Sequence, residues 1–376
     1  MSTSPVKYSG SRRRLRRGIS FGAGTLLAAV LLAACASSNH RSAVSRSTTT
    51  SSEATAVGAI PAPPKGGVKA LKIAFFSLGT SNTYLVKAQD GVVSEAQKYG
   101  LSVHIYEANF NAVTQYDQLA TALSSGSYNA FIIDPVSGQP ICSEIKQAIS
   151  KHILVVTAIL PACSLYTLNG VAQWEPGEVA NVGGQTPDWW DGFFQYIAAQ
   201  NPNGGKVIIL TGPTADSLTA QTDTAAKKEL PASKFTIVSN QATDYTTADG
   251  YKVAYAALEA NPSANILISN YSGVTLGVVS AAKALGRLSS LKIYDAGGTT
   301  QIMDLVKAGE VQASYILLPY REATESVKAL VDYVEGKPVP KFINPYTSSD
   351  PVLPHGQLWI TKANVDQFLA DSAVAY

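Results

Sequence analysis

The side chains best suited to nucleophilic or metal chemistry are three cysteines and four histidines, spread over 376 residues. The histidines are His40, His104, His152 and His355, and neither they nor the cysteines recur at the short spacings of a zinc site. Gly204-Gly205-Lys206 lacks the spacing of a phosphate-binding loop, and residues 35–376 contain no G-x-G-x-x-G or G-x-S-x-G motif. No spacing pairs two carboxylates as a general acid and a general base. We therefore expect no catalytic residue, no metal ligand and no cofactor, and a hydrolase is the disfavoured alternative.

The first cysteine, Cys35, follows a segment typical of an export signal. Residues 12–17 are rich in arginine, and residues 18–34 are uncharged and mostly apolar. An apolar run of this length is at the short limit for a membrane span and ends in small residues, so it predicts a signal peptide over 1–34. Leu32-Ala33-Ala34-Cys35 resembles the bacterial lipobox, in which the cysteine is lipidated and becomes the first residue of the mature protein. An ordinary signal peptide with an incidental cysteine is the alternative, and both the general and the twin-arginine export routes stay open.

The charge of the chain is unevenly distributed. Six of the 29 basic residues lie in residues 1–34, which contain no acid, so the rest carries 23 basic and 27 acidic side chains. The formal net charge is +2 for the whole chain and −4 without the leader, which argues against nucleic acid as a partner. Residues 35–67 are rich in Ser, Thr, Ala and Pro and predict a disordered tether between a lipid anchor and the globular part.

The other two cysteines, Cys142 and Cys163, lie beyond the leader. If the chain is exported, a disulfide is the default for such a pair, because the compartment is oxidising. The two cysteines flank one predicted helix and one predicted strand, which would allow both to lie at the same end of a sheet. Two buried free thiols are the alternative. A catalytic cysteine is not expected, because the nearest histidine in the sequence, His152, lies where the predicted helix runs into the strand.

From Leu71 onward, short apolar runs alternate with segments of helical periodicity. In the first half, strands are predicted over 71–77, 102–107, 130–133 and 154–157, and helices over 84–99, 116–123 and 140–150. After the turn-rich segment 201–205 the pattern restarts, with strands over 207–210, 235–238, 266–269 and 292–294 and helices over 218–230, 246–259 and 274–285. This alternation predicts parallel sheets with helices on both faces. A strand over 312–317 and a helix over 322–335 are expected to return to the first sheet.

Several stretches resemble a known family in their order and spacing. They include Ser81-Asn82-Thr83-Tyr84, and residues 130–135, 206–212, 294–299 and 305–309. Together they resemble the periplasmic sugar-binding proteins of the ribose-binding, type I kind, which serve ABC importers, and the similarity runs from about 71 to 341. The resemblance implies an α/β fold of two doubly wound parallel-sheet lobes, joined by a three-segment hinge and closing on a ligand. The predicted division is an N-terminal lobe of 68–184 plus 318–345 and a C-terminal lobe of 185–317 plus 346–376.

The resemblance also implies which side chains bind the ligand. Members of the family place aromatic rings against the C–H faces of sugars and polar side chains at the hydroxyls. On this basis the predicted ligand-binding residues are Ser77, Asn82, Tyr84, Tyr245, Asn270 and Asp295, of which Ser77 is a weaker candidate. Trp190 is added as a candidate that the resemblance does not imply. Ordinary turn capping is the alternative role for Asn and Asp at the ends of strands.

Other positions depart from the pattern of the family. Ile159-Leu160 stand where ribose-type receptors carry Asp-Arg, Thr222 stands near an expected arginine, and Leu317 replaces a hinge glutamine. Such a site would leave several pyranose hydroxyls unpaired, at about 1–3 kcal/mol each. Simple ribose specificity is therefore not expected.

Aromatic side chains gather near the first predicted crossover between the lobes. Trp189 and Trp190 stand where the family usually has small residues, and Trp174 and Tyr271 also lie near strand ends. The tryptophan pair predicts either packing beside the hinge or an aromatic wall for a flatter, less hydroxylated ligand.

These observations predict an extracytoplasmic, monomeric receptor that is anchored to the cell membrane through a lipid on Cys35. It would capture a sugar, or a sugar-like or aromatic solute, between its lobes and deliver it to an ABC permease and its ATPase. The alternative is a receptor of the same fold that reports ligand occupancy to a membrane sensor.

Overall fold

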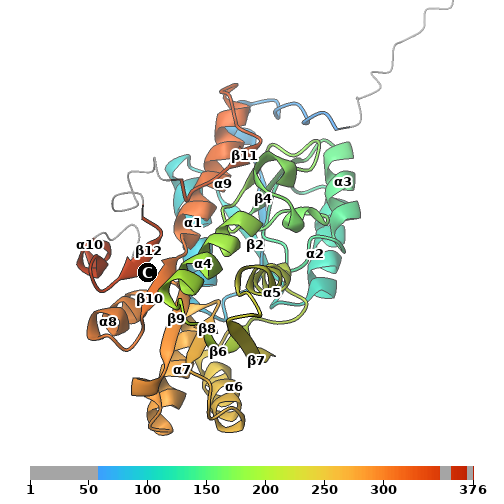
Figure 1. Ribbon diagram of the computed structural model, residues 1–376. Helices are drawn as coiled ribbons and strands as arrows, with labels where there is room; N and C mark the ends of the chain where they lie inside the picture. Colours follow the sequence, from blue (N-terminus) through green and yellow to red (C-terminus); the bar gives the residue numbers. More distant parts are fainter. Residues whose placement is uncertain (1–57, 348–356, 371–375) are drawn as a thin grey trace, which may run out of the picture. The chain divides into compact units, whose positions relative to one another are not determined.

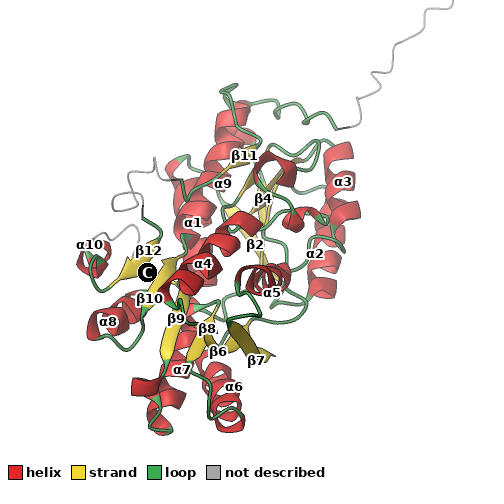
Figure 2. Cartoon of the chain, viewed as in Figure 1, coloured by secondary structure: helices red, strands yellow, loops and turns green. Residues whose placement is uncertain are grey.

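Two six-stranded sheets form the centre of the protein. The computed structural model describes residues 58–347, 357–370 and 376, and Figures 1 and 2 show how its elements are arranged. The first sheet has the order β11-β5-β4-β3-β1-β2 and the second β12-β10-β9-β8-β6-β7. All the pairs are parallel except β10 with β12, which is antiparallel. The predicted fold class, two α/β lobes built on doubly wound parallel sheets, is confirmed.

The strands of the first sheet are β1 (Ile73–Ser77), β2 (Val103–Glu107), β3 (Ala130–Ile133), β4 (Leu154–Ala158), β5 (Ala180–Val182) and β11 (Phe342–Ile343). Those of the second are β6 (Gly205–Thr211), β7 (Phe235–Ala242), β8 (Ile266–Ser269), β9 (Lys292–Gly297), β10 (Ala313–Ile316) and β12 (Trp359–Thr361). The helices of the first lobe are α1 (Thr83–Lys98), α2 (Ala112–Ser125), α3 (Cys142–Ser150) and α9 (Pro319–Val334). Those of the second are α4 (Pro187–Gln200), α5 (Ser217–Glu229), α6 (Thr247–Ala260), α7 (Ser272–Ala284), α8 (Thr300–Ala308) and α10 (Val365–Leu369).

Successive side chains along each strand point to opposite faces of the first sheet, and both faces are apolar. Phe75 of β1 belongs to the same buried cluster as Val92 of α1 and Val327 of α9, whereas its neighbour Phe76 packs with Leu119 of α2. Figure 1 shows α1 and α9 side by side on one face of this sheet. Their close approach depends on Gly91, because a Cβ there would lie 2.6 Å from the carbonyl oxygen of Tyr320. Burial on both faces explains why these strands have continuous apolar runs.

The chain passes between the sheets three times: from β5 to β6, from β10 to β11, and from β11 to β12. The predicted return of strand 312–317 to the first sheet is wrong, because β10 pairs with β9 in the second sheet. Only the helix that follows it, α9, returns to the first lobe, where it packs on α1 and β4. The strand completes one lobe and the helix completes the other, so the second crossing lies between Ile316 and Pro319.

The described part of the chain begins inside the predicted tether. Residues 58–66 have an irregular backbone and Gly67 begins a short 3₁₀ helix, but Pro61 is buried and its carbonyl accepts a hydrogen bond from Tyr333 Oη at 2.8 Å. This segment is therefore packed on α9, and the prediction of disorder up to 67 extends too far. The predicted signal peptide and Cys35 lie outside the described residues. Among the helices of the described part, none is long and apolar enough to cross a membrane.

Candidate functional site

Residues from both lobes enclose a cavity of about 50 Å³ at the carboxyl ends of the two sheets. Much of its wall is apolar: Leu78, Leu85, Phe110, Ile159, Leu160, Leu218 and Leu317. The remaining wall is formed by Asn82, Tyr84, Gln185, Asp216, Tyr245, Asn270 and Tyr271. Four of the predicted ligand-binding residues, Asn82, Tyr84, Tyr245 and Asn270, thus come together here. The position agrees with the general rule that doubly wound sheets bind ligands beyond the carboxyl ends of their strands.

A second, larger groove of about 460 Å³ adjoins the cavity and shares Asn82, Tyr245 and Tyr271 with it. Its other walls are mainly hydroxyl-bearing, with Thr246 and Thr247 at the start of α6 and Thr299 and Thr300 at the start of α8. Between the two spaces, Thr83 Oγ1 of the first lobe and Tyr271 Oη of the second form a hydrogen bond of 3.0 Å. This contact joins the two lobes at the edge of the cavity.

The start of α1 positions Asn82 and Tyr84. Asn82 is the N-cap residue of the helix, and its Oδ1 accepts a hydrogen bond of 3.0 Å from Leu85 N. Asn82 therefore has the capping role that was the alternative to ligand contact, yet it also lines the cavity. Because Oδ1 is engaged by the helix, the group of Asn82 that remains for a ligand is its Nδ2.

Tyr84 takes part in a buried hydrogen-bond cluster where the three crossings meet. Its hydroxyl donates to Glu322 Oε2 at 2.5 Å and accepts from Gln185 Nε2 at 2.9 Å. Gln185 belongs to the first crossing and Glu322 to the first turn of α9, just after the second. Tyr346 belongs to the third crossing, and its hydroxyl accepts a hydrogen bond of 2.9 Å from Leu318 N. Burial raises the pKa of Glu322 to about 7, although hydrogen bonds from Tyr84, Gln185 and Tyr346 favour its charged form.

The loop between β6 and α5 positions Asp216, and the loop between β7 and α6 brings Tyr245 against it. Asp216 caps α5 by accepting from Leu218 N at 2.9 Å, and its second oxygen accepts from Tyr245 Oη, also at 2.9 Å. Both residues are buried, and burial raises the pKa of Asp216 to about 6. Asp216 was not among the predicted site residues. It lies in the loop after a buried strand and is the N-cap residue of α5, so the sequence did contain a signal for it.

Gly212, directly after β6, leaves the space that the Tyr245 ring fills. A Cβ at Gly212 would lie 1.8 Å from Tyr245 Cζ. We expect Gly212→Ala to displace the ring from the cavity wall, to weaken solute binding, and to lower the free energy of unfolding by about 1–3 kcal/mol. Urea unfolding and calorimetric titration would measure both effects. Gly286→Ala is the matched control for an added methyl group, because no atom lies within 4 Å of its Cβ, although its φ of 64° adds backbone strain. Equal solute affinities for Gly212→Ala and the unmodified protein would contradict the expectation.

Asn270 and Tyr271 follow β8 and precede α7. Asn270 Nδ2 donates to Thr222 Oγ1 at 3.3 Å, and the hydroxyl of Thr222 in turn donates to Leu218 O. Because the Thr222 hydroxyl donates to Leu218, it can only accept from Asn270, which fixes the orientation of the Asn270 amide. Asn270 Oδ1 is then left without a partner, and the residue is fully buried. Thr222 therefore orients an asparagine of the wall at the position where the family resemblance implied an arginine.

Three predicted ligand-binding residues do not line the cavity. Ser77 Oγ is engaged within the turn after β1, where it accepts a hydrogen bond of 3.1 Å from Gly79 N. Trp190 is fully buried in the core of the second lobe, with its ring centroid 4.7 Å from that of Trp189 and 5.6 Å from that of Phe193. Packing beside the hinge is therefore the role that the structure gives to the tryptophan pair.

Asp295 lies beneath the cavity rather than on its wall. β9 continues through it to Gly297, and its side chain lies on the face covered by α7. There it accepts hydrogen bonds from Ser272 Oγ at 3.0 Å, Thr275 Oγ1 at 2.5 Å and Ser314 Oγ. The carboxylate is thus saturated by its own lobe. The predicted strand ended at 294, which is why Asp295 was assigned to a strand end.

The apolar replacements noted in the sequence do lie at the site. Ile159, Leu160 and Leu317 all line the cavity, whereas Gln185, Phe110 and Leu218, which also line it, were not foreseen. Gln185 follows the three-residue strand β5, which has too little sequence signal to be predicted. The cavity therefore offers fewer polar partners to a solute than the family resemblance implied.

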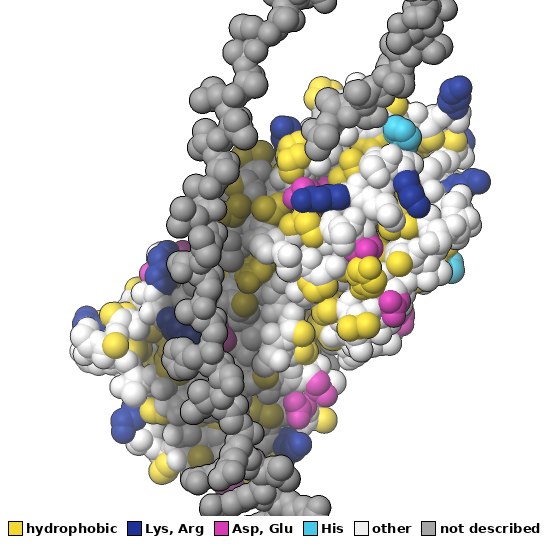
Figure 3. Space-filling view, turned by 90° about the vertical axis from the view of Figure 1, so that its right-hand side faces the viewer, with side chains coloured by type: hydrophobic (Ala, Val, Ile, Leu, Met, Phe, Trp, Pro, Cys, Tyr) yellow, Lys and Arg dark blue, Asp and Glu magenta, His cyan; other side chains and the backbone are white. Residues whose placement is uncertain are grey.

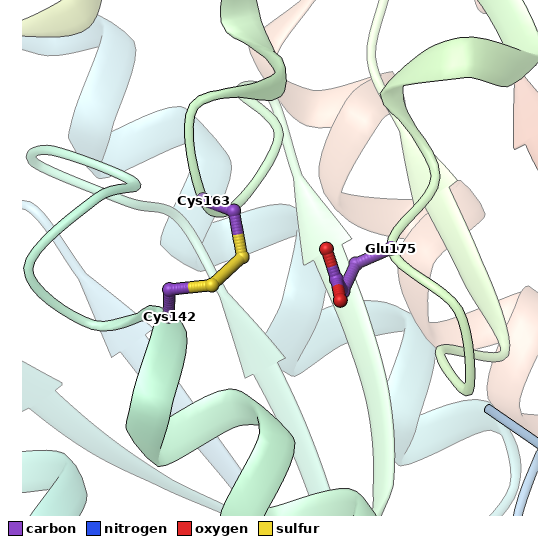
Figure 4. Close-up of side chains that lie close together, drawn as sticks. All are labelled: Cys142, Cys163 and Glu175. Atoms are coloured by element: carbon purple, nitrogen blue, oxygen red, sulfur yellow. A yellow bond between two sulfur atoms is a disulfide. The ribbon is translucent and has the colours of Figure 1, made fainter. Parts of the chain in front are cut away.

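Cys142 and Cys163 lie together at the start of α3 and after β4, with their Sγ atoms 1.99 Å apart (Figure 4). Glu175 lies beside them, and within the described residues these three form the one group of potential metal ligands, with ligand atoms within 4.8 Å of one another. Two sulfurs joined to each other are not thiolates, so they do not suit a metal. Glu175 instead pairs with Lys146 at 3.3 Å.

On the face shown in Figure 3, acidic and basic side chains are interspersed.

Comparisons with known proteins agree with this architecture. A family model described as a periplasmic binding protein domain matches residues 73–338. The ribose import binding protein of Escherichia coli (strain K12) is 23% identical over 260 residues, which are 69% of this chain and 83% of that protein. The D-ribose/D-allose-binding protein of Pseudomonas aeruginosa is 24% identical over 322 residues, which are 83% of this chain and 91% of that protein.

Solved structures show the same fold. An ABC transporter solute binding protein from Mycobacterium smegmatis with bound glycerol has a TM-score of 0.68 and 19% identity, covering 82% of this chain and 99% of its own. The Caulobacter myo-inositol binding protein has a TM-score of 0.67 and 17% identity, covering 81% of this chain and 97% of its own. The neighbours thus share the complete two-lobed architecture of this chain.

Proposed function

Because the chain belongs to the periplasmic binding protein family, we propose that it is an extracytoplasmic solute receptor that closes its two lobes on a small molecule. The observation that carries the proposal is the cavity whose walls come from both lobes at the carboxyl ends of both sheets. The family consists of substrate-binding proteins rather than enzymes, and the proposed role includes no catalytic step.

Closure is proposed to occur about the three crossings between the sheets, with lobe boundaries at 184/185, 317/318 and 345/346. The cluster of Tyr84, Gln185 and Glu322 lies at these crossings, and the hydrogen bond between Thr83 and Tyr271 lies at the cavity edge. Hinge bending of a few connecting segments is the usual way in which two packed lobes enclose a ligand. A cavity of about 50 Å³ has room for only a few water molecules, so a solute must enter while the lobes are apart.

The predicted lipobox supports an anchor on Cys35, and the family supports an ABC permease and its ATPase as partners. Curated relatives are named as ribose import binding proteins, and solved neighbours carry glycerol or myo-inositol. We propose import of a small solute of this size range, by a monomeric receptor held at the outer face of the cell membrane. Simple ribose specificity is not proposed, because Ile159, Leu160 and Leu317 remove polar partners from the wall.

Thermal unfolding of the full chain, purified in detergent, tests this function. The panel consists of sugars, polyols, nucleosides, aromatic acids and small amines at millimolar concentration. A solute that binds only the folded state raises the melting temperature, by several degrees when its concentration far exceeds its dissociation constant. We expect at least one class to do so. If no class shifts the melting temperature, solute binding is not the function of this chain.

We also propose that Cys142 and Cys163 form a disulfide in the exported protein. The expected result is that reduction of the unfolded full chain exposes two additional reactive thiols per molecule, because the pair is the source of both. Thiol titration in guanidinium, before and after reduction, measures this number. Cys142→Ser is the control, since it should expose one thiol without reduction. A thiol count that does not change on reduction would show that the pair is not oxidised.

A further inference from the structure

Among the hydrogen-bonding side-chain groups of the cavity wall, acceptors without a partner outnumber donors. Among the described residues that line it, the buried side-chain atoms without a partner are Gln185 Oε1 and Asn270 Oδ1, and both are acceptors. The orientation of Gln185 is fixed, because Tyr84 gives its proton to Glu322 and can therefore only accept from Gln185 Nε2. On the donor side, the wall offers Asn82 Nδ2. A buried acceptor without a partner costs about 1–3 kcal/mol, so these oxygens favour a solute that donates hydrogen bonds.

Carboxylates add negative charge to this excess of acceptors. Asp216 is part of the wall, and Asp134 follows β3 at the same sheet edge. Register places Asp134 level with Ser77 of β1 and Ala158 of β4, one residue before Leu78 and Ile159, which line the cavity. Asp134 is buried, and both of its carboxylate oxygens are without a partner. Burial, together with the charges of Asp216 and Glu322, raises the pKa of Asp134 well above its usual range.

No positive charge of the described residues balances these carboxylates at the cavity. Neither the cavity nor the adjoining groove has a lysine or arginine among its described wall residues. Buried carboxylates without a cation are costly, and the charged form is recovered when an opposite charge comes within about 4–6 Å. The site therefore lacks a positive charge, which a solute could supply.

Building on the proposed function, we propose that the solute is a small amine whose protonated nitrogen is held by the acceptors of Asn270, Gln185 and the two aspartates. An ammonium group has three donors and no acceptor, and it matches a wall of unpartnered acceptors. A neutral polyol matches this wall less well, because every hydroxyl also needs a donor. The apolar body of the amine would lie against Ile159, Leu160 and Leu317.

Matched pairs of probes test the proposal: cyclohexylamine with cyclohexanol, and D-glucosamine with D-glucose. Each pair differs in one ammonium or hydroxyl group. Calorimetric titration of the full chain in detergent at pH 7.5 is expected to show that at least one amine binds about tenfold or more tightly than its hydroxyl partner. Asp134→Asn and Asp216→Asn are expected to bring this ratio down to about threefold or less, because they remove charge with little change in shape. Asn is also a good N-cap, so Asp216→Asn retains the start of α5.

Asp117→Asn, on the exposed side of α2, is the control for loss of one acidic charge and should leave the ratio unchanged. A neutral probe that binds as tightly as its amine overturns the proposal, while solute binding itself stands. A ratio that persists in both aspartate variants also overturns it. If none of the four probes binds, the amine proposal is wrong, and the wider panel described above decides separately whether the chain is a solute receptor.

Discussion

Replacing Trp190 with alanine is expected to lower the free energy of unfolding by about 3–5 kcal/mol, because it removes a large, fully buried side chain and leaves a cavity. The ring packs edge-on against Trp189 and Phe193, and Phe193 in turn stacks on Trp359 of β12 with centroids 5.4 Å apart. Trp190 thus helps to attach α4 to the sheet of the second lobe. Urea unfolding followed by tryptophan fluorescence measures the change.

Tyr251→Ala is a suitable control for this prediction, because Tyr251 is an exposed aromatic on α6, with 38% of its surface accessible, and its loss should cost far less. The milder Trp190→Leu keeps most of the packing and allows a binding measurement. Since Trp190 does not line the cavity, this variant should bind the best solute of the panel as the unmodified protein does. Loss of binding in a folded Trp190→Leu protein would restore the interpretation of Trp190 as a wall of the site.

The stability of the protein is expected to fall as the pH rises from about 4.5 to about 7, and Glu322 should account for much of the change. Burial raises its pKa to about 7, from an ordinary value of 4.5. The folded state therefore holds this proton more tightly than the unfolded chain does. The stabilisation is fully present below about pH 4.5 and is lost as the pH passes through 7, by about 3 kcal/mol.

The hydrogen bonds that Glu322 accepts favour its charged form, but burial outweighs them and raises its pKa. Tyr84, Tyr346 and Tyr376 are neutral in this range, and Asp134 is an acid whose own pKa is raised by burial and by the charges of Asp216 and Glu322. Asp216, with its pKa raised to about 6, gives a loss of the same sign over a lower pH range. Burial of its carboxylate has the largest influence on the pKa of Glu322. The direction of the pH dependence is therefore determined by desolvation.

Urea unfolding between pH 4.5 and 7.5 measures this dependence. In Glu322→Gln the slope should be smaller than in the unmodified protein, because glutamine does not titrate, whereas its amide can still accept from Tyr84. Glu325→Gln is the matched control on the same helix, where Glu325 pairs with Lys328 at 2.8 Å near the surface. A slope in Glu322→Gln that equals that of Glu325→Gln would mean that Glu322 does not carry the effect.

The sequence predicted most of the fold because the parallel strands are buried on both faces. β1, β3, β4 and β8 are continuous apolar runs followed by turn residues, and their predicted bounds differ from the structure by at most two residues. β5 and β11 have three and two residues, respectively, and such short strands have no pattern of their own. The helix α4 was also missed, although Thr186 and Pro187 form a recognisable N-cap and first helical position.

The site could be predicted only in part, because the sequence does not show which way a side chain at the end of a strand points. Asn270 and Asp295 both follow apolar runs, but Asn270 lies beyond β8 and reaches the cavity, whereas Asp295 lies within β9 and points to α7. The side chains that engage Asp295 come from Ser272, Thr275 and Ser314, which are distant in the sequence. No local pattern reveals such a network. The departures at Ile159, Leu160 and Leu317 were visible because a resemblance provided the expected residues.

The measurement that tests the central claim most directly is the affinity of Asn270→Ala for the best solute of the panel. Asn270 is fully buried on the cavity wall and has an unpartnered oxygen, so a solute held between the lobes must lose a contact in this variant. Calorimetric titration, with Asp117→Asn as the control, should show binding weakened by about tenfold or more, for a loss of about 1.5–3 kcal/mol. An unchanged affinity in a variant that melts at nearly the normal temperature would show that the solute is not bound in this cavity.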